Sequence, residues 1–140
     1  MKFKISQTQQ YFLGIIIFTL LVIFFYIKQQ KIFLKIIEKP VYSISKITGI
    51  KHYNRKEDSY KYEFTFLGEK FERGIGESSS NNLFVGKRYF VIFEKGNPKN
   101  SMLIPFIFVP DSITKAPDEG WVQPPIPIDK NEIKKFLENY

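Results

Sequence analysis

One long uncharged apolar run dominates the N-terminal part of the chain. From Tyr11 to Ile27 the sequence reads YFLGIIIFTLLVIFFYI, seventeen residues without a charge. At 1.5 Å per residue such a helix is about 25 Å long, close to the roughly 30 Å of a bilayer's hydrocarbon core. Tyr26 and Tyr11 stand at its ends, where amphipathic rings favour the membrane interface. The run predicts a membrane-spanning helix, and Ser6 with Gln9 predicts a capping box that starts it.

Two other interpretations of this run are a cleaved signal peptide and the core helix of a soluble domain. The apolar part of a signal peptide usually has about 7–15 residues and precedes a cleavage site of small residues. Here the run is longer, and the sequence KQQK follows it. A retained, single-pass membrane anchor is therefore the interpretation that the sequence favours.

Beyond Pro40, which ends the helical pattern, apolar and polar residues alternate with a period of two, as in β-strands. A first strand is predicted at 41–50 and a second at 60–67. The second strand places four aromatic side chains on one face: Tyr60, Tyr62, Phe64 and Phe66. Gly68-Glu69 suits a two-residue type II′ turn, which would set Phe66 opposite Phe71 and Tyr62 opposite Ile75. Phe71 and Ile75 belong to the third strand.

Residues 77–82, ESSSNN, predict a polar loop, and two further strands follow it. The fourth is expected at 88–94, a turn at 95–98, and the fifth at 102–109, broken or placed at the sheet edge by Pro105. Five short strands at this spacing predict a small SH3-like or OB-like barrel, or a strongly curled antiparallel sheet. The fold class is thus mainly β, with helices at both ends.

The C-terminal part begins with a Pro-rich, irregular stretch from Pro110 to Pro127, which contains the only tryptophan, Trp121. We expect it to pack along the barrel or to run back towards the membrane. Asp129 and Glu132 then predict the start of a short helix. The chain is accordingly divided into a transmembrane helix with a basic extension (1–39), a small β-domain (40–110), and a Pro-rich segment with a C-terminal helix (111–140).

The basic charge of the chain gathers directly after the apolar run. Residues 28–56 carry eight Lys or Arg against one acidic residue, whereas residues 57–140 carry eleven basic and thirteen acidic residues. This placement indicates a membrane surface rather than a nucleic acid as the partner of the charge. Four lysines at helical spacing are the candidates for contact with lipid headgroups: Lys28, Lys31, Lys35 and Lys39. A solvated continuation of the same helix explains them equally well.

The same lysines bear on orientation. Five lysines from Lys28 to Lys46 follow the span, against Lys2, Lys4 and the amino terminus before it. By the positive-inside rule this predicts a cytoplasmic C-terminal domain.

Candidate chemistry is sparse in this sequence. There is no cysteine, and His52 is the only histidine. A disulfide framework, a thiol nucleophile and a Cys-ligated metal are therefore excluded, and we expect no cofactor and no metal. His52 with Glu57 and Asp58 could do acid–base work, but no nucleophile or oxyanion hole accompanies it. A loop histidine is the simpler interpretation, and the sequence does not predict an enzyme.

Three other features have a functional and a structural interpretation. The aromatic ladder of the second strand could stack bases, but in a small barrel such a row is usually the core. Glycines at 74, 76, 86 and 96 form no phosphate-binding motif and are expected at strand ends and turns. Asn97 and Ser101, around Pro98, are expected to accept backbone N–H groups in a turn.

Residues 85–101, VGKRYFVIFEKGNPKNS, resemble a pattern of uncharacterised small bacterial membrane proteins. In these, an N-terminal hydrophobic helix precedes a β-domain with a G-x-x-Y-x-V-x-(Y/F) strand and an N-P-x-x-S turn. The matching positions are Gly86, Tyr89, Val91, Phe93, Asn97, Pro98 and Ser101. The resemblance covers about residues 40–105 and implies a domain of unknown function, so it adds no activity.

Taken as a sequence, the chain therefore predicts a non-enzymatic interaction or accessory module held at the bilayer, with a protein as its further partner. Two other roles stay open: an OB-like binder of nucleic acid or oligosaccharide tethered to the membrane, and an enzyme whose site is not visible in the sequence. Nucleic acid is the less expected partner, because the charge lies beside the span.

Overall fold

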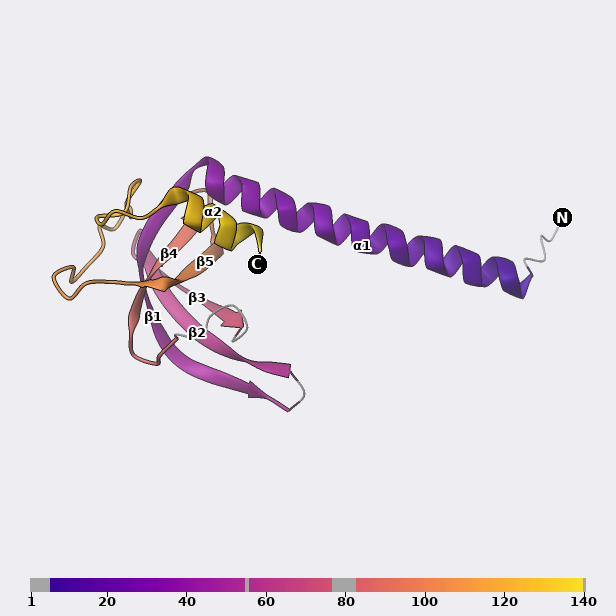
Figure 1. The fold of residues 1–140 in the computed structure, drawn as a ribbon, viewed down its shortest axis with the longest axis horizontal. Helices are drawn as coiled ribbons and strands as arrows, with labels where there is room; N and C mark the ends of the chain where they lie inside the picture. Colours follow the sequence, from indigo (N-terminus) through magenta and orange to yellow (C-terminus); the bar gives the residue numbers. More distant parts are fainter. Residues whose placement is uncertain (1–5, 55, 77–82, 140) are drawn as a thin grey trace. The chain divides into compact units, whose positions relative to one another are not determined.

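A computed structural model describes residues 6–54, 56–76 and 83–139 of the chain. The chain divides into two compact units, Met1–Leu34 and Lys35–Tyr140. The helix α1 (Gln7–Glu38) runs without interruption from the first unit into the second (Figure 1). The predicted capping box is present, because Ser6 N–H donates to Gln9 Oε1 (3.0 Å) and Gln9 N–H donates to Ser6 Oγ (3.4 Å).

The apolar part of α1 is the one helix among the described residues that is long and apolar enough to cross a membrane. No side chain in its most apolar 18-residue window is buried within the protein. Tyr11 and Tyr26, at the ends of the predicted span, are 73% and 65% exposed. An apolar surface of this length needs a nonaqueous environment, as a bilayer provides.

The second unit is built on one antiparallel sheet of five strands, drawn in Figure 1: β1 (Pro40–Tyr53), β2 (Lys56–Phe66), β3 (Glu69–Gly76), β4 (Arg88–Glu94) and β5 (Asn97–Phe108). Their order in the sheet is β3-β2-β1-β4-β5. The partial order β4-β1-β2-β3 is a Greek key, and the edge strands β3 and β5 contact each other, so the sheet curls into a partly closed barrel. The predicted five-stranded, curled architecture is confirmed.

Aromatic side chains of the inner face form the core. Tyr62, Phe64 and Phe66 are at most 5% exposed, and the ring of Phe64 lies 5.1 Å from that of Phe93 on β4. The Tyr62 hydroxyl contacts Ser101 Oγ on β5 (3.2 Å), which ties the two halves of the curled sheet together. Burial raises the pKa of Tyr89, whose hydroxyl oxygen accepts a hydrogen bond from Phe84 N–H (3.0 Å).

A second layer covers the outer face of the sheet. Strand β4 is buried on both faces, because Phe90 and Ile92 point away from the barrel interior and are still 0% and 2% exposed. The helix α2 (Lys130–Glu138) contributes to this layer through Phe136, whose ring packs edge-on against Phe106 at 5.5 Å. Asp129 caps α2, as predicted, by accepting a hydrogen bond from Asn131 N–H (2.8 Å).

The β2–β3 turn corrects one sequence prediction. The two-residue loop is Leu67-Gly68 rather than Gly68-Glu69, and both residues have positive φ (50° and 79°), as a type I′ turn requires. The observed pairs are Phe64 with Phe71 and Tyr60 with Ile75. The predicted register, Phe66 with Phe71 and Tyr62 with Ile75, is therefore wrong by two residues. Because two is the period of a strand, the aromatic side chains keep their face.

The β4–β5 connection is also shorter than predicted. Lys95 and Gly96 form the turn, Asn97 already pairs with Glu94, and β5 starts at Asn97 instead of Met102. The expected role of Asn97 and Ser101 in a turn is thus wrong, since both belong to a strand. The prediction for Pro105 is confirmed, because it lies in an edge strand beside a register irregularity.

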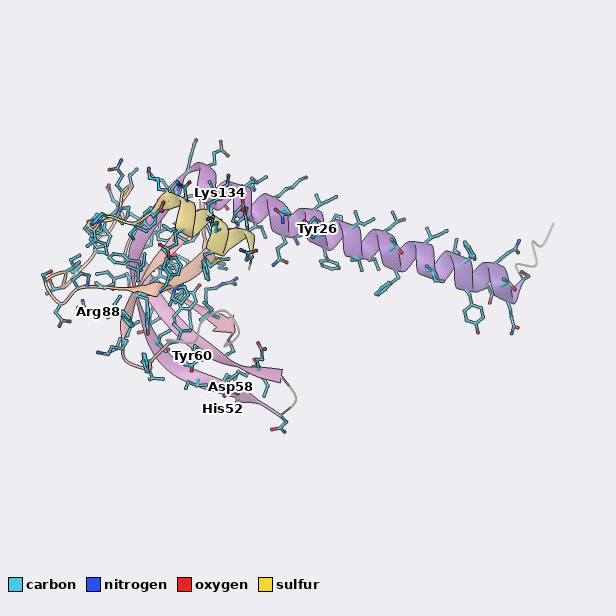
Figure 2. The ribbon with its side chains drawn as sticks, viewed as in Figure 1. Tyr26, His52, Asp58, Tyr60, Arg88 and Lys134 are labelled. Carbon is cyan, nitrogen blue, oxygen red and sulfur yellow. The ribbon has the colours of Figure 1, made fainter. Side chains whose placement is uncertain are left out.

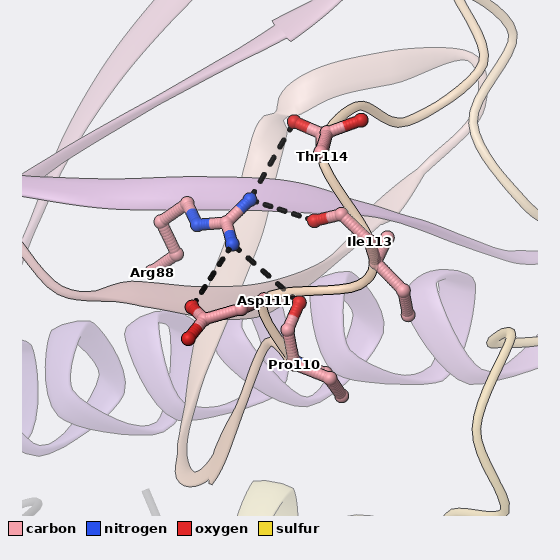
Figure 3. Close-up of polar contacts among 5 residues, drawn as sticks. All are labelled: Arg88, Pro110, Asp111, Ile113 and Thr114. Carbon is pink, nitrogen blue, oxygen red and sulfur yellow. Dashed lines mark hydrogen bonds and ion pairs between the residues drawn. The ribbon is translucent and has the colours of Figure 1, made fainter.

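Residues 110–121, which we call the strap, cross the outer face of the sheet and are fixed at three places. The Arg88 guanidinium donates to the carbonyl of Ile113 (2.7 Å) and lies 3.7 Å from the Asp111 carboxylate (Figure 3). Leu67 N–H donates to Asp118 O (2.7 Å). Tyr42 and Trp121 exchange two backbone hydrogen bonds of 2.8 Å each.

Candidate functional site

The four lysines predicted to contact headgroups all lie at the C-terminal end of α1 or just beyond it. Lys28, Lys31 and Lys35 are helical, and Lys39 follows the last helical residue. All four are exposed, and among the residues that the structure describes none of them has a side-chain partner. Ile36, next to Lys35 in the same turn, is 2% exposed, whereas Leu34 is 59% exposed. This end of the helix therefore presents a surplus of positive charge, and one of its apolar side chains, Ile36, is buried.

The histidine and a carboxylate do form the pair considered from the sequence. His52 Nδ1 lies 2.7 Å from Asp58 Oδ2, across the projecting end of the β1–β2 hairpin (Figure 2). The His52 side chain is 75% exposed, and neither of the two grooves described below is lined by it. Among the described residues no group of three His, Asp or Glu is placed to hold a metal ion. Within the described residues, this pair lies outside both grooves.

The aromatic ladder of β2 is part of the core. Tyr62, Phe64 and Phe66 are buried, and Tyr60 and Phe71 are half-buried against them. The strand therefore offers no free row of rings on which bases could stack. This observation removes the surface that the nucleic-acid interpretation relied on.

The larger groove lies between the strap and the outer face of β1 and β2, with a volume of about 430 Å³. Its charged lining residues largely neutralise one another: Lys70 pairs with Glu63 at 2.5 Å, and Lys115 with Asp118 at 3.5 Å. Lys46 also lines the groove and has no ion-pair partner within the described ranges. The groove is thus polar, close to neutral and open to solvent.

A smaller groove, of about 330 Å³, lies on the projecting part of β1, β2 and β3. Its basic lining residues are Lys51, Lys61 and Arg73. A side-chain hydrogen bond with Glu72 (2.6 Å) raises the pKa of Lys61, and the same contact lowers the pKa of Glu72. Lys51 Nζ lies 5.1 Å from the centre of the Tyr53 ring. This groove combines surplus positive charge with one exposed aromatic ring.

Three apolar side chains are exposed around the buried ring of Tyr89, at the end of the sheet where β4 starts and β5 ends. Phe84, Val85 and Phe108 are 55%, 53% and 48% exposed. The Phe108 ring lies 5.2 Å from that of Tyr89, and the Phe84 backbone donates to the Tyr89 hydroxyl. We call these three residues the apolar rim. Sequence reasoning missed it, because Phe84 and Val85 lie outside the predicted strands and the pattern does not show that Phe108 is exposed.

The sequence analysis also missed Arg88 and Gly120, which hold and shape the strap. A Cβ on Gly120 would lie 2.5 Å from Val41 Cγ1 and 2.7 Å from Tyr42 O. The predicted loop at 77–82 lies outside the described residues. Of the motif positions that carried the resemblance, Tyr89, Val91 and Phe93 are fully buried, so they are core residues of β4.

Comparison with protein-family models, with curated proteins and with solved structures finds no match to this chain. The functional residues are therefore assigned from the geometry of this protein alone.

Proposed function

We propose that the chain is a single-pass membrane protein whose β-domain is a non-enzymatic interaction or accessory module, with lipid and a protein as its partners. One observation carries the proposal. The exposed apolar residues of α1 belong to the same uninterrupted helix that ends in the folded β-domain. A domain that follows directly on a membrane-spanning helix stays within a short covalent distance of the membrane surface.

The second half of the proposal rests on the apolar rim. Exposed apolar side chains that lie together on a small domain are typical of protein contact sites. The rim includes two phenylalanines, and aromatic residues are enriched in such contacts. A protein partner is therefore the role that these residues support.

We expect the full-length chain to stay with membranes that are washed in alkaline carbonate, because the uncharged run inserts into the bilayer. The matched control replaces Ile17 and Leu21 with Lys. Each lysine near the middle of a span costs about 3 kcal/mol, so this variant should move towards the soluble fraction. Recovery of the unaltered chain in the soluble fraction would contradict anchoring.

The same membranes test the interaction half of the proposal. A photo-crosslinking residue at Phe84 should give a discrete protein adduct, and one at Ser112, an exposed polar position on the strap, should not. If the chain stays in the membrane but gives no adduct at position 84, the membrane anchor is supported and the apolar rim is not a partner site.

We further propose that the C-terminal domain faces the cytoplasm, on the basis of the lysines that follow the span. A single cysteine placed at Ser112 should then resist an impermeant thiol reagent in intact cells. A cysteine at Gln7, before the span, should react. The chain has no native cysteine, so each label reports one position. Labelling at Ser112 with protection at Gln7 would reverse the orientation.

The small groove on the hairpin favours one second role, a tethered binder of single-stranded nucleic acid. Its surplus cations suit phosphates, and Tyr53 offers one ring for stacking. The test is the affinity of the chain for a single-stranded oligonucleotide. If the chain binds it, and both added salt and the variant Tyr53→Ala weaken binding, nucleic-acid binding becomes the favoured function.

A further inference from the structure

The end of the sheet at which α1 enters the β-domain is basic. Pro40, the first residue of β1, pairs with Glu94, the last residue of β4, and the turn that leads into β5 follows there. We call this the junction end. The β-sheet register therefore brings lysines from three segments to it: Lys35 and Lys39 before β1, Lys95 in the turn, and Lys99 early in β5.

The lysines of the junction end outnumber its carboxylates by four to two. All four lysines are exposed, and within the ranges that the structure describes none forms an ion pair. The two carboxylates at this end are those of Glu38 and Glu94, and Glu94 Oε2 accepts a hydrogen bond from the neutral Asn100 Nδ2 (2.8 Å). The junction end therefore keeps a surplus of two positive charges. On β2 and β3, by contrast, lysines are neutralised across strands, Lys61 by Glu72 and Lys70 by Glu63. Surplus charge at the junction end is thus available to an outside partner.

The partner chemistry follows from the covalent distance to the apolar run. Lys35 lies eight positions after Ile27 in the helix, a rise of about 12 Å, which is close to the Debye length of about 8–10 Å at physiological salt. Lys46 and Lys87, at the opposite end of the β1–β4 pair, form no ion pair within the described residues. They lie six strand residues from the junction end, roughly 20 Å, which is about two Debye lengths.

We infer that the junction end docks onto anionic lipid headgroups, with Lys95 of the β4–β5 turn and Lys99 of β5 acting together with Lys35 and Lys39. The inference rests on the proposed membrane anchor and adds a lipid preference to it. Lysine suits this contact, because its compact, strongly hydrated charge associates with a headgroup layer without inserting into it. Each lysine near an anionic leaflet strengthens docking about fivefold.

The test uses the full-length chain with a single cysteine at Asn97, the exposed first residue of β5, labelled with a fluorophore and reconstituted into vesicles. One vesicle set is phosphatidylcholine alone, and the other contains about one third phosphatidylserine. Both sets carry a nitroxide quencher on the lipid headgroup. We expect stronger quenching in the phosphatidylserine vesicles, with the difference lost at high salt.

The variant Lys95→Gln with Lys99→Gln should lower the ratio of docked to undocked domain about 30-fold in phosphatidylserine vesicles. The matched control, Lys46→Gln with Lys87→Gln, removes the same charge from the opposite end and should leave quenching unchanged. Equal loss in both variants would show a diffuse charge effect and overturn the inference. Quenching that does not depend on phosphatidylserine would overturn it as well.

Flotation of the same vesicles keeps this outcome separate from the proposed function. If the chain floats with the vesicles but quenching is equal with and without phosphatidylserine, the inferred headgroup contact is wrong and the membrane anchor stands. If the chain does not float, the membrane anchor itself fails. If the Lys95 and Lys99 variant leaves lipid quenching intact and instead loses the protein adduct at position 84, the lysines bind an acidic protein, and the lipid inference is rejected.

Discussion

Replacing Phe64 with Ala is expected to unfold the β-domain or to leave it barely stable. The Phe64 side chain is 3% exposed and packs against three rings, those of Tyr62, Phe71 and Phe93, at 6.5, 5.4 and 5.1 Å. Truncating a buried Phe to Ala costs about 3–5 kcal/mol, because the lost contacts leave a cavity. A small domain has a total stability of only about 5–15 kcal/mol.

The measurement is denaturant unfolding of the full-length chain in detergent, followed by the fluorescence of Trp121. This residue is the only tryptophan, and its ring lies 6.2 Å from Phe90 in the outer layer, so its emission reports on the folded sheet. The control is Phe84→Ala, which removes a 55% exposed ring and should change stability by less than about 0.5 kcal/mol. Equal midpoints for the two variants would show that the ladder is not the core.

Replacing Gly120 with Ala is expected to destabilise the domain by about 2–5 kcal/mol. A left-handed conformation costs a non-glycine residue about 1–2 kcal/mol, and φ at Gly120 is +68°. The added Cβ would also meet Val41 Cγ1 at 2.5 Å and the backbone oxygen of Tyr42 at 2.7 Å. Overpacking of this kind costs a further 1–3 kcal/mol or so.

Gly68→Ala is the matched control for this prediction. Gly68 also has a positive φ (+79°), but a Cβ there would meet no atom within 4 Å. It should therefore show only the conformational cost of about 1–2 kcal/mol. The difference between the two variants measures how firmly the strap is held against β1. Equal effects would mean that the strap yields to the extra methyl group without loss.

The sequence predicts those parts of the fold that depend on local pattern. The apolar run of 11–27 predicts α1, and the short apolar run within 88–94 predicts β4 with the bounds that the structure has. The contact between His52 and Asp58 could also be predicted from the sequence, because a hairpin brings residues of this spacing together. In each case the decisive contacts lie within one element or between neighbouring strands.

The β2–β3 turn shows where local pattern stops being sufficient. Gly68 accommodates a positive φ, but the type I′ turn also needs one at Leu67, which is unusual for a branched residue. Leu67 N–H is bonded to Asp118, 51 residues further along the chain, so the strap helps to hold this turn. The sequence around the turn therefore does not reveal this contact, and the turn type could not be predicted from it.

The candidate surfaces were predicted less completely than the fold. The lysines at the end of α1 are visible as a run, whereas Lys95 and Lys99 join them only through the pairing of β1 with β4. The role of Arg88 depends in the same way on carbonyl groups 22 to 26 residues away. A surface formed by separate segments can be predicted only when the strand register is known. At the β2–β3 turn the register predicted from the sequence was wrong.

The bridge between Tyr42 and Trp121 protects the first strand from other molecules. The pairing of β1 with β2 starts only at Ser45, so the backbone of Tyr42 on that side has no strand beside it, and Trp121 takes the place that a longer β2 would have held. Open strand edges recruit strands of other chains and lead to aggregation. A chain that ends before residue 121 therefore exposes this edge, and the C-terminal strap works as a built-in safeguard against such edge-to-edge association.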